Sequence, residues 1–316
     1  MQQSTIYLEP TPPYDFDLIA GYVTRFRGVY GADSYVHGTF RRLLTIDEQL
    51  VLVSVSDAGT LESPSLKLDL RGRKLGENRV AEARRLTGWM LGADDDLNPF
   101  YRAAESDAYL DAVVRCLRGL HLARSPTVFE ALVVAILGQQ ISFHVAAMLR
   151  LLLVQTYGES IRLDGDTYYA FPHPQALAAA GVGPLRDCKL SVRKAEYIVG
   201  IASDVASGDL DLERLRGETS EAAVETLTGI RGVGPWTAQW MLIRALGHAD
   251  GFPSGDLALQ RTMGLLVDNG SPMTAREAEA YSLRWSPHRS YVTTYLFAAA
   301  RSGRMPALAS PVGTRR

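Results

Sequence analysis

Leu227-Thr-Gly-Ile-Arg-Gly-Val-Gly-Pro-Trp-Thr-Ala238 is the stretch of this 316-residue chain that decides its fold. We expect one helix to end at Gly229 and a second to begin at Pro235, because proline suits the first turn of a helix. Gly232 and Gly234 can adopt backbone angles closed to other residues, so the turn between the two helices can be very tight. Bare N–H groups at the start of the second helix form an anion site that suits a DNA phosphate. Such a turn also serves nucleotide binding or tight packing, but the missing strand before it argues against a dinucleotide fold.

A carboxylate follows this hairpin in the loop Gly251-Phe-Pro-Ser-Gly-Asp256, twenty residues after Trp236. Asp256 precedes a helix that we expect to begin at Leu257, and aspartate is a favoured residue for capping a helix start. A carboxylate near a sugar can also stabilise developing positive charge and orient water. Capping and catalysis are both open for Asp256, and they are compatible.

The composition indicates a globular chain with 47% hydrophobic residues, a size that suits two or three compact units. No run of eighteen apolar residues and no signal-peptide layout is present, so we expect no membrane and an intracellular, cytoplasmic location. The two cysteines, Cys116 and Cys188, cannot form a four-thiolate iron-sulfur or zinc site. The formal net charge of -2 argues against a nucleic-acid partner unless basic residues gather on one face.

The predicted fold class is α+β. Short alternating runs between Tyr35 and Leu70 predict an antiparallel sheet, with a helix before it over Phe16 to Arg27 and another after it over Asn78 to Leu91. From Asp107 onward the periodicity is helical throughout. We therefore expect an N-terminal α/β domain over 1–106, an all-helical region over 107–304 that contains the hairpin at about 219–247, and a disordered tail over 305–316.

Three further segments support a resemblance to the helix-hairpin-helix DNA glycosylase superfamily, within it the AlkA-like 3-methyladenine DNA glycosylase II group. Phe129-Glu-Ala-Leu-Val-Val-Ala-Ile-Leu-Gly-Gln-Gln-Ile-Ser142 resembles the helix and loop that this family inserts into the duplex. Pro12-Pro-Tyr-Asp-Phe16 and Trp285-Ser-Pro-His-Arg-Ser-Tyr291 match near the two ends. The resemblance covers roughly 12–303, and its most specific part is the hairpin with Asp256.

The resemblance implies base removal from double-stranded DNA that contains alkylated bases such as 3-methyladenine and 7-methylguanine. Asp256 would stabilise the oxocarbenium-like sugar and activate water. Relatives that also cut the backbone carry a lysine shortly after the hairpin, where this chain has Trp236. We therefore expect a monofunctional, monomeric glycosylase without metal or redox cofactor. A monovalent cation held by hairpin carbonyls follows only by analogy.

Aromatic residues are the predicted pocket for the flipped base. Trp236, Trp240 and Ile243 lie at the spacing of an ordinary core-facing stripe, so core packing and a pocket role are both open for the tryptophans. Stacking on electron-rich rings suits a cationic base. By position within the matched motifs, Tyr22 and Phe297 resemble two more pocket residues.

DNA contacts are expected from the hairpin and from the loop that follows Gly138. The predicted set is Gly232, Gly234, Thr237, Gln139, Gln140 and Ser142. Gln140 stands where relatives can present an apolar wedge, so it would fill the gap left by the flipped base. Alternatively, both glutamines cap the helix end. His288 also departs from the family pattern, since an aromatic ring is expected at its position. A metal role for His288 is not expected, because no second ligand lies at metal spacing.

Two other functions remain open. A non-catalytic damaged-DNA-binding protein of the same fold would use the sheet and hairpin without cutting. A helical scaffold unrelated to DNA would make the hairpin and the spaced aspartate coincidental. Loss of base release in Asp256→Asn would distinguish a glycosylase from the non-catalytic binding protein. Absent or salt-insensitive DNA binding would instead support the helical scaffold.

Overall fold

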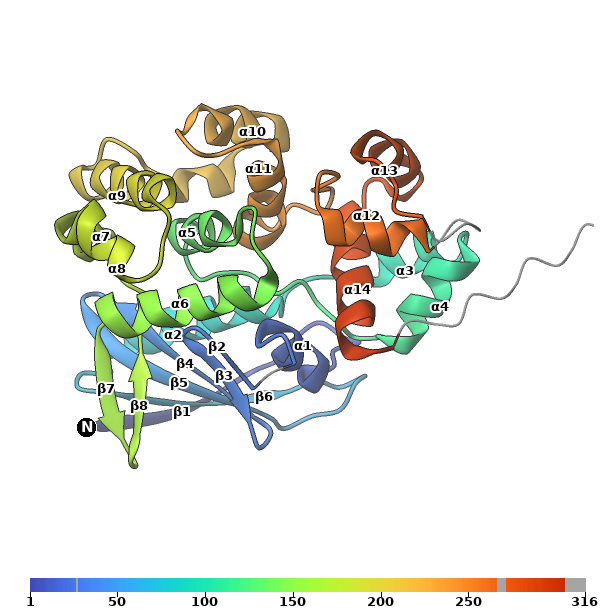
Figure 1. Ribbon diagram of the computed structural model, residues 1–316. Helices are drawn as coiled ribbons and strands as arrows, with labels where there is room; N and C mark the ends of the chain where they lie inside the picture. The colour runs from blue at the N-terminus through green and yellow to red at the C-terminus, as the bar shows by residue number, and fades with distance from the viewer. Residues whose placement is uncertain (27, 266–270, 305–316) are drawn as a thin grey trace, which may run out of the picture.

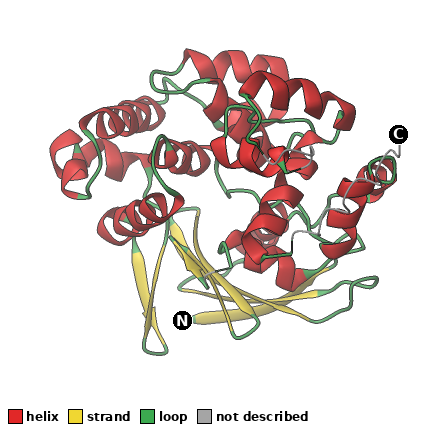
Figure 2. Cartoon of the chain, turned by 45° about the vertical axis from the view of Figure 1, so that its right-hand side comes forward, coloured by secondary structure: helices red, strands yellow, loops and turns green. Residues whose placement is uncertain are grey.

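The computed structural model describes residues 1–26, 28–265 and 271–304 of the chain. A six-stranded antiparallel sheet lies at one end of the molecule and helices cover the rest (Figures 1 and 2). The order of strands across the sheet is β1-β6-β5-β4-β3-β2. Their bounds are β1 Gln2–Leu8, β2 Val29–Tyr30, β3 Asp33–Val36, β4 Thr39–Ile46, β5 Gln49–Asp57 and β6 Leu66–Gly72. The tail predicted to be disordered, 305–316, falls outside the described residues.

Two-residue turns set the register of the central strands. His37 and Gly38 join β3 to β4, and Asp47 and Glu48 join β4 to β5, all four with positive φ. Positive φ at both central residues defines the turn type whose twist matches antiparallel strands. The predicted sheet over Tyr35 to Leu70 is confirmed, and the two edge strands, β1 and β2, are additions to it. Strand β2 has only two residues, and β1 also gives little signal. That edge strand exposes most of its side chains, so the sequence carries little alternation to reveal it.

The first hydrophobic core combines both ends of the chain. The sheet packs on α1 (Phe16–Val23) and α2 (Glu77–Leu91), and the same core continues into the C-terminal helices. These are α12 (Leu257–Gly264), α13 (Ala275–Ser282) and α14 (Arg289–Ser302), with α3 (Asn98–Ala104) and α4 (Ala108–Cys116) beside them (Figure 1). Residues before 124 and after 251 therefore share one core.

A second core is built from the middle of the chain. Buried side chains from 128 to 246 form it without the sheet. Its helices are α5 (Val128–Gly138), α6 (Phe143–Tyr157), α7 (Pro174–Ala180), α8 (Val182–Asp187), α9 (Val192–Ser207), α10 (Ser220–Gly229) and α11 (Pro235–Met241). Short helical turns add Glu213–Gly217 and Leu242–Leu246, whereas a third turn, Leu283–Trp285, belongs to the first core. The domain boundary expected at residue 107 stays a prediction.

One hairpin interrupts the helices expected after Asp107. Strands β7 (Ser160–Leu163) and β8 (Asp166–Tyr169) pair through an Asp164-Gly165 turn, where both residues have positive φ. Ile161, Leu163 and Tyr168 pack on the outer face of the main sheet. The segment was not recognised because each strand has only four residues and little burial. No helix within the described residues is long and apolar enough to cross a membrane.

Candidate active site

The hairpin has the predicted geometry. Helix α10 ends at Gly229 and α11 begins at Pro235, with Gly234 as its N-cap. Gly232 has φ of +93°, and a Cβ atom there would lie 2.4 Å from the ring of Tyr197. Only glycine fits such a position. Gly234 is exposed, and no atom lies within 4 Å of the place where a Cβ would be, so the start of α11 is open to a ligand.

Asp256 uses its two carboxylate oxygens for different partners. Oδ1 accepts the backbone N–H groups of Ala258 at 2.9 Å and Leu259 at 3.1 Å, which caps α12. Oδ2 accepts the indole N–H groups of Trp236 at 3.1 Å and Trp240 at 3.3 Å. Capping therefore occupies one oxygen and leaves the other among the tryptophans. A carboxylate held at four points in this way has a fixed direction, which is what electrostatic catalysis requires.

A cavity of about 1170 Å³ lies in front of this carboxylate. Elements of both cores line it, including the end of α5, the start of α6, α11 and the C-terminal part of α14. Of the residues predicted from the sequence, those that line it are Asp256, Trp236, Trp240, Phe297, Gln139, Gln140, Ser142, Gly234 and Thr237. The ring of Phe297 packs 5.6 Å from that of Trp240. Tyr22 and Gly232 are not among the lining residues.

Tyr22 lies behind the cavity wall. Its side chain is 0% exposed, and its hydroxyl accepts a hydrogen bond from Arg244. Burial alone would raise the pKa of Tyr22, but the positive charges of Arg244, Arg25 and Arg301 outweigh burial and lower it to about 8. Tyr22 thus contacts the arginines behind the wall, and its role in stacking on a base stays a prediction.

The loop between α5 and α6 is tied to the hairpin. The side-chain amide of Gln139 donates to the carbonyl of Gly232 at 2.9 Å and to the hydroxyl of Thr237 at 3.1 Å. Thr237 itself is only 2% exposed. Gln140 is exposed at the tip of the loop with φ of +55°, and Ser142 caps α6. Gln140 therefore points outward from the loop, while Gln139 bonds the loop to the hairpin.

Lys194 on α9 secures the same loop from below. Its Nζ donates to the carbonyl of Leu137 at 2.8 Å, in the last turn of α5. Burial lowers the pKa of Lys194. A cation at the C-terminal end of a helix is favoured by the helix dipole. In the sequence Lys194 lies among other basic residues, Arg186, Lys189 and Arg193, and nothing in its spacing distinguishes it from them.

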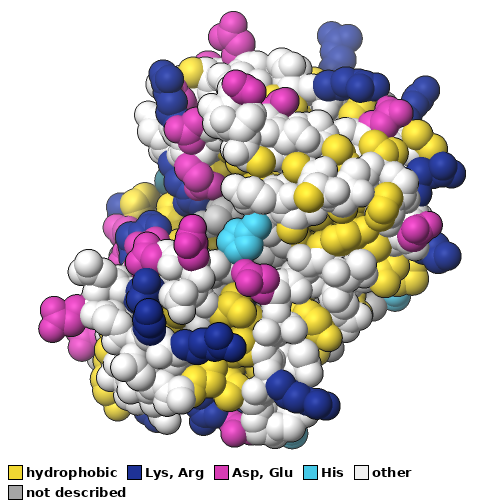
Figure 3. All heavy atoms as spheres, turned by 90° about the vertical axis from the view of Figure 1, so that its left-hand side faces the viewer, with side chains coloured by type: hydrophobic (Ala, Val, Ile, Leu, Met, Phe, Trp, Pro, Cys, Tyr) yellow, Lys and Arg dark blue, Asp and Glu magenta, His cyan; other side chains and the backbone are white. Residues whose placement is uncertain are grey.

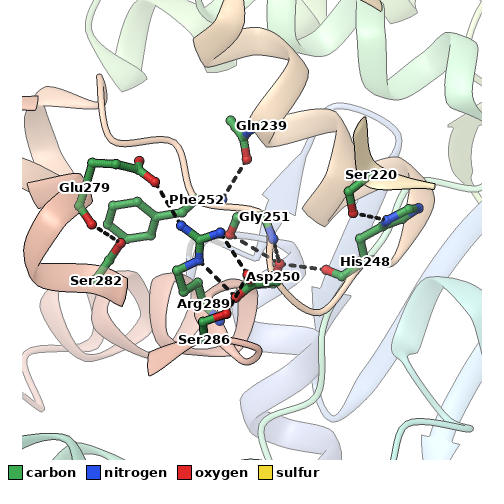
Figure 4. A network of polar contacts seen from close by, with 11 residues as sticks. Ser220, Gln239, His248, Asp250, Gly251, Phe252, Glu279, Ser282, Ser286 and Arg289 are labelled. Atoms are coloured by element: carbon green, nitrogen blue, oxygen red, sulfur yellow. Dashed lines mark hydrogen bonds and ion pairs between the residues drawn. The ribbon is translucent and has the colours of Figure 1, made fainter. Parts of the chain in front are cut away.

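A polar network fixes the loop that delivers Asp256 (Figure 4). The N–H of Gly251 donates to Ser290 Oγ at 2.8 Å, and the N–H of Phe252 donates to Gln239 Oε1 at 2.8 Å. Arg289 forms ion pairs with Asp250 at 2.8 Å and with Glu279 at 2.9 Å. Gln239 belongs to α11, so this network joins the hairpin helix to α13 and α14.

His288 fills an aromatic position rather than a metal site. Its ring lies 6.2 Å from that of Phe100 and 6.3 Å from that of Tyr291. Burial lowers the pKa of His288. Among the described residues, no group of three or more His, Cys, Asp or Glu side chains could hold a metal ion. A monovalent cation at the hairpin backbone stays a prediction.

Sequence reasoning missed three arginines that line the cavity, Arg25, Arg244 and Arg301. They come from the segment after α1, the helical turn after α11 and the end of α14. Burial, together with the charge of Arg25, lowers the pKa of Arg301 to about 10. Burial also lowers the pKa of Arg244. No sequence motif marks these residues, because each is isolated on its own segment.

One face of the molecule carries mixed rather than basic charges. On the face drawn in Figure 3, Lys and Arg side chains are interspersed with Asp and Glu. Some of the basic residues are paired with acids. Arg71 pairs with Asp164, and Arg85 pairs with Glu82. These contacts are typical of charges on a solvated surface.

The chain is similar to known base excision repair proteins. Residues 133–288 match the HhH-GPD superfamily of base excision DNA repair proteins. A DNA-3-methyladenine glycosylase of Bacillus subtilis (strain 168) is 38% identical over 204 residues, which cover 65% of this chain and 67% of that protein. DNA-3-methyladenine glycosylase 2 of Escherichia coli (strain K12) is 28% identical over 287 residues, covering 90% and 94% of the two chains. A solved structure, the 3-methyladenine DNA glycosylase from Archaeoglobus fulgidus, superposes with a TM-score of 0.82 at 30% identity, covering 94% of this chain and 98% of that chain.

Proposed function

Because the chain belongs to the HhH-GPD superfamily, and within it to the DNA-3-methyladenine glycosylases, we propose that it hydrolyses the N-glycosidic bond of alkylated bases in double-stranded DNA. Lesions of the 3-methyladenine and 7-methylguanine type are the proposed substrates. The observation that carries the proposal is Asp256, whose Oδ2 is held by two indole N–H groups beside the cavity.

The proposed reaction needs one carboxylate and one water. The bond between the sugar C1′ and the base nitrogen breaks, and its electron pair leaves with the base. Positive charge then develops on the sugar, where Asp256 stabilises it. Water adds to C1′ and gives up a proton, for which Asp256 is the nearby acceptor. A methylated purine already carries positive charge, so it leaves without a strong general acid.

We propose that the enzyme removes the base without cutting the backbone. A lyase step needs an amine that forms a Schiff base with the sugar. Trp236 stands at the position of that lysine, and its indole donates to Asp256. No lysine is among the described residues that line the cavity. The product would be an abasic site that breaks only after treatment with alkali.

DNA would be held at two places. The open start of α11 at Gly234 suits a backbone phosphate, because N–H groups at a helix start attract anions. Gln140 projects from its loop and would enter the stack when the base flips out. Gln139, Thr237 and Gly232 would support these contacts from behind, and Ser142 would cap the helix that follows. A single chain contains the whole site, so we expect the monomer to be active.

The test compares the purified protein with Asp256→Asn on duplex DNA that contains methylated purines. We expect the wild type to release free bases and to leave alkali-sensitive sites, and the variant to lose release while still binding the duplex. Asp204→Asn, an exposed aspartate on α9, is the matched control and should retain activity. Tight binding by the wild type without release of any lesion would instead support a non-catalytic damage-binding protein.

A further inference from the structure

Leu257 is the most exposed large apolar side chain in the part of the chain that the structure describes. It is 67% exposed, it directly follows Asp256, and it lines the active-site cavity. Exposure alone has no special meaning, because single apolar side chains are common on protein surfaces. Leu283, for example, is 60% exposed and lies outside the cavity lining. The place of Leu257 beside the proposed catalytic carboxylate is what distinguishes it.

Helix α12 presents one face to the first core and another to the cavity. Its buried side chains include Leu259 and Met263. Leu257, Ala258 and Arg261 instead line the cavity, at the i, i+1 and i+4 spacing of a single helix face. The proposed reaction uses only the carboxylate that caps this helix, so a face with one apolar and one cationic side chain is left without a role.

Arg261 is an exposed cation on that face of α12. Within the described residues it forms no ion pair with a carboxylate. The buried arginines of the same cavity, Arg42 and Arg150, are by contrast paired with acids. Four residues of a helix rise by about 6 Å, so Arg261 lies one turn beyond Leu257. An exposed guanidinium in this position can bind a DNA phosphate.

Asp256 fixes where Leu257 lies relative to a bound sugar. Its Oδ1 accepts the N–H groups of Ala258 at 2.9 Å and Leu259 at 3.1 Å, and its Oδ2 accepts the indole N–H of Trp236 at 3.1 Å. The carboxylate therefore has one direction, and Leu257 is its neighbour in the chain. A deoxyribose that faces the carboxylate would lie beside Leu257, and the carbon atoms of the sugar offer an apolar surface for contact.

The loop between α5 and α6 supplies no apolar side chain at its tip, where Gln140 is exposed. Proteins that unstack a duplex commonly insert leucine, isoleucine, methionine or phenylalanine between bases. Leu257 is an apolar group of this kind on another segment of the cavity lining. The loop is bonded to Thr237 and Asp256 is bonded to Trp236, both at the start of α11, so the two segments are held to the same hairpin helix.

We propose that the exposed face of α12 is a DNA contact, in which Leu257 packs on the strand that carries the flipped nucleotide and Arg261 binds a phosphate of the same strand. The inference rests on the proposed function, because the flipped nucleotide is the one that faces Asp256. Leu257 acts as a positioning residue, since it stabilises the open duplex and touches no reacting atom. Gln140 and Leu257 then hold the opened strand from two segments.

The first experiment measures single-turnover base release, and base flipping by the fluorescence of a base analogue beside the lesion. In Leu257→Ala we expect release at saturating enzyme to fall by about tenfold and the flipping signal to weaken. The free energy of unfolding should not change, because this side chain belongs to neither core. Leu257→Met keeps an apolar chain of similar size and should retain both signals. Leu283→Ala, at the other exposed leucine, should behave as the wild type.

The second experiment measures how the affinity for duplex DNA depends on salt concentration. Each phosphate that a protein neutralises adds about one unit to the slope of log affinity against log salt. In Arg261→Gln we expect the slope to become shallower by about one unit. Arg115→Gln, which removes an exposed arginine on α4, should leave the slope unchanged.

The outcomes separate this inference from the proposed function. Wild-type release and flipping in Leu257→Ala, or a wild-type salt slope in Arg261→Gln, would overturn the inference alone. A loss of stability that accompanies the slower release in Leu257→Ala and persists in Leu257→Met would also overturn it, because the role would then be structural. Release of no base by the wild type would overturn the proposed function, while the flipping signal and the salt slope would still test the contact.

Discussion

Asp256 is placed to serve both the structure and the proposed chemistry. Its Oδ1 caps α12 and its Oδ2 receives two indole N–H groups, so the helix start fixes the direction of the carboxylate. A free carboxylate would have to reorganise as charge develops on the sugar, whereas a fixed one does not. The two interpretations left open by the sequence are therefore compatible in a single geometry.

Trp240→Phe tests the value of this orientation. The variant keeps an aromatic ring in the cavity but loses the hydrogen bond to Oδ2. A hydrogen bond to a charged group contributes about 1.5 to 3 kcal/mol, so we expect base release to slow by roughly 10- to 100-fold. Single-turnover rates on methylated duplex DNA measure the change.

Trp285→Phe is the matched control for this substitution. Trp285 also donates its indole N–H to an aspartate, Asp107, at 3.0 Å, but it lies outside the cavity lining. We expect it to lose stability and to keep its rate of base release. Equal slowing in both variants would mean that the Trp240 effect is structural.

The phenol of Tyr22 should titrate near pH 8. Its pKa is lowered to about 8, because burial, which raises it, is outweighed by Arg244, Arg25 and Arg301. In the unfolded chain it returns to its ordinary value of about 10, so the contribution to stability is absent below pH 8 and grows as pH rises to 10. We expect the difference in unfolding free energy between wild type and Tyr22→Phe to grow by about 2 to 3 kcal/mol over that range.

Phenolate absorbance provides a direct check on Tyr22. Tyr22 should ionise near pH 8 in the wild type, and this step should be absent in Tyr22→Phe. Tyr7 is exposed on β1, and Tyr7→Phe should leave the low-pH step intact. A wild-type curve without any step below pH 9 would contradict the electrostatic effect of the arginines on Tyr22.

Local spacing made part of the site predictable from the sequence. Asp256 and the two tryptophans lie within one hairpin and the loop after it, so their proximity follows from a short stretch of chain. The three arginines come from segments more than fifty residues apart, and each resembles an ordinary surface charge in the sequence. Only tertiary packing brings them to one cavity, which is why the aromatic pocket was expected and its charge was not.

At the scale of elements, helix starts were the most predictable features. Ser191, Thr219 and Thr127 cap α9, α10 and α5 through side-chain oxygens, and Pro235 begins α11. These signals are chemical and local. The strands β1, β2, β7 and β8 could not be predicted in the same way, because they are short or at an edge and bury few side chains.

The loop between α5 and α6 depends on the hairpin for its position. Gln139→Ala removes both hydrogen bonds that tie the loop to Gly232 and Thr237. We expect base release to fall by about tenfold, because Gln140 would no longer be held for insertion. Affinity for undamaged duplex should change less, since the open start of α11 is unaltered.

Fluorescence of a base analogue placed beside the lesion reports the flipping step. Gln155→Ala, at an exposed position on α6, is the control and should behave as the wild type. A normal flipping signal with slow release in Gln139→Ala would contradict the idea that the two hydrogen bonds of Gln139 hold Gln140 for insertion.

At the scale of the whole molecule, the cavity lies where two hydrophobic cores meet. A buried cluster of four charges joins them there. Arg42 on β4 and Arg150 on α6 each pair with Asp33 on β3 and with Glu130 on α5. The sheet is therefore linked by ion pairs to α5 and α6, the helices on either side of the loop that carries Gln140, and the N-terminal region contributes to the geometry of the cavity.

Glu130→Gln should reveal the strength of this junction. The substitution keeps the shape of the side chain but removes one of the two carboxylates that pair with Arg42 and Arg150, so that Asp33 remains. Breaking a buried ion pair costs about 3 to 5 kcal/mol. The free energy of unfolding, measured with urea, should fall by that amount. Glu62→Gln removes a carboxylate from an exposed pair with Arg118 and should cost less than about 1 kcal/mol. Equal costs in the two variants would mean that the cores are held together by apolar packing alone, because burial of the pair would then contribute nothing beyond a surface contact.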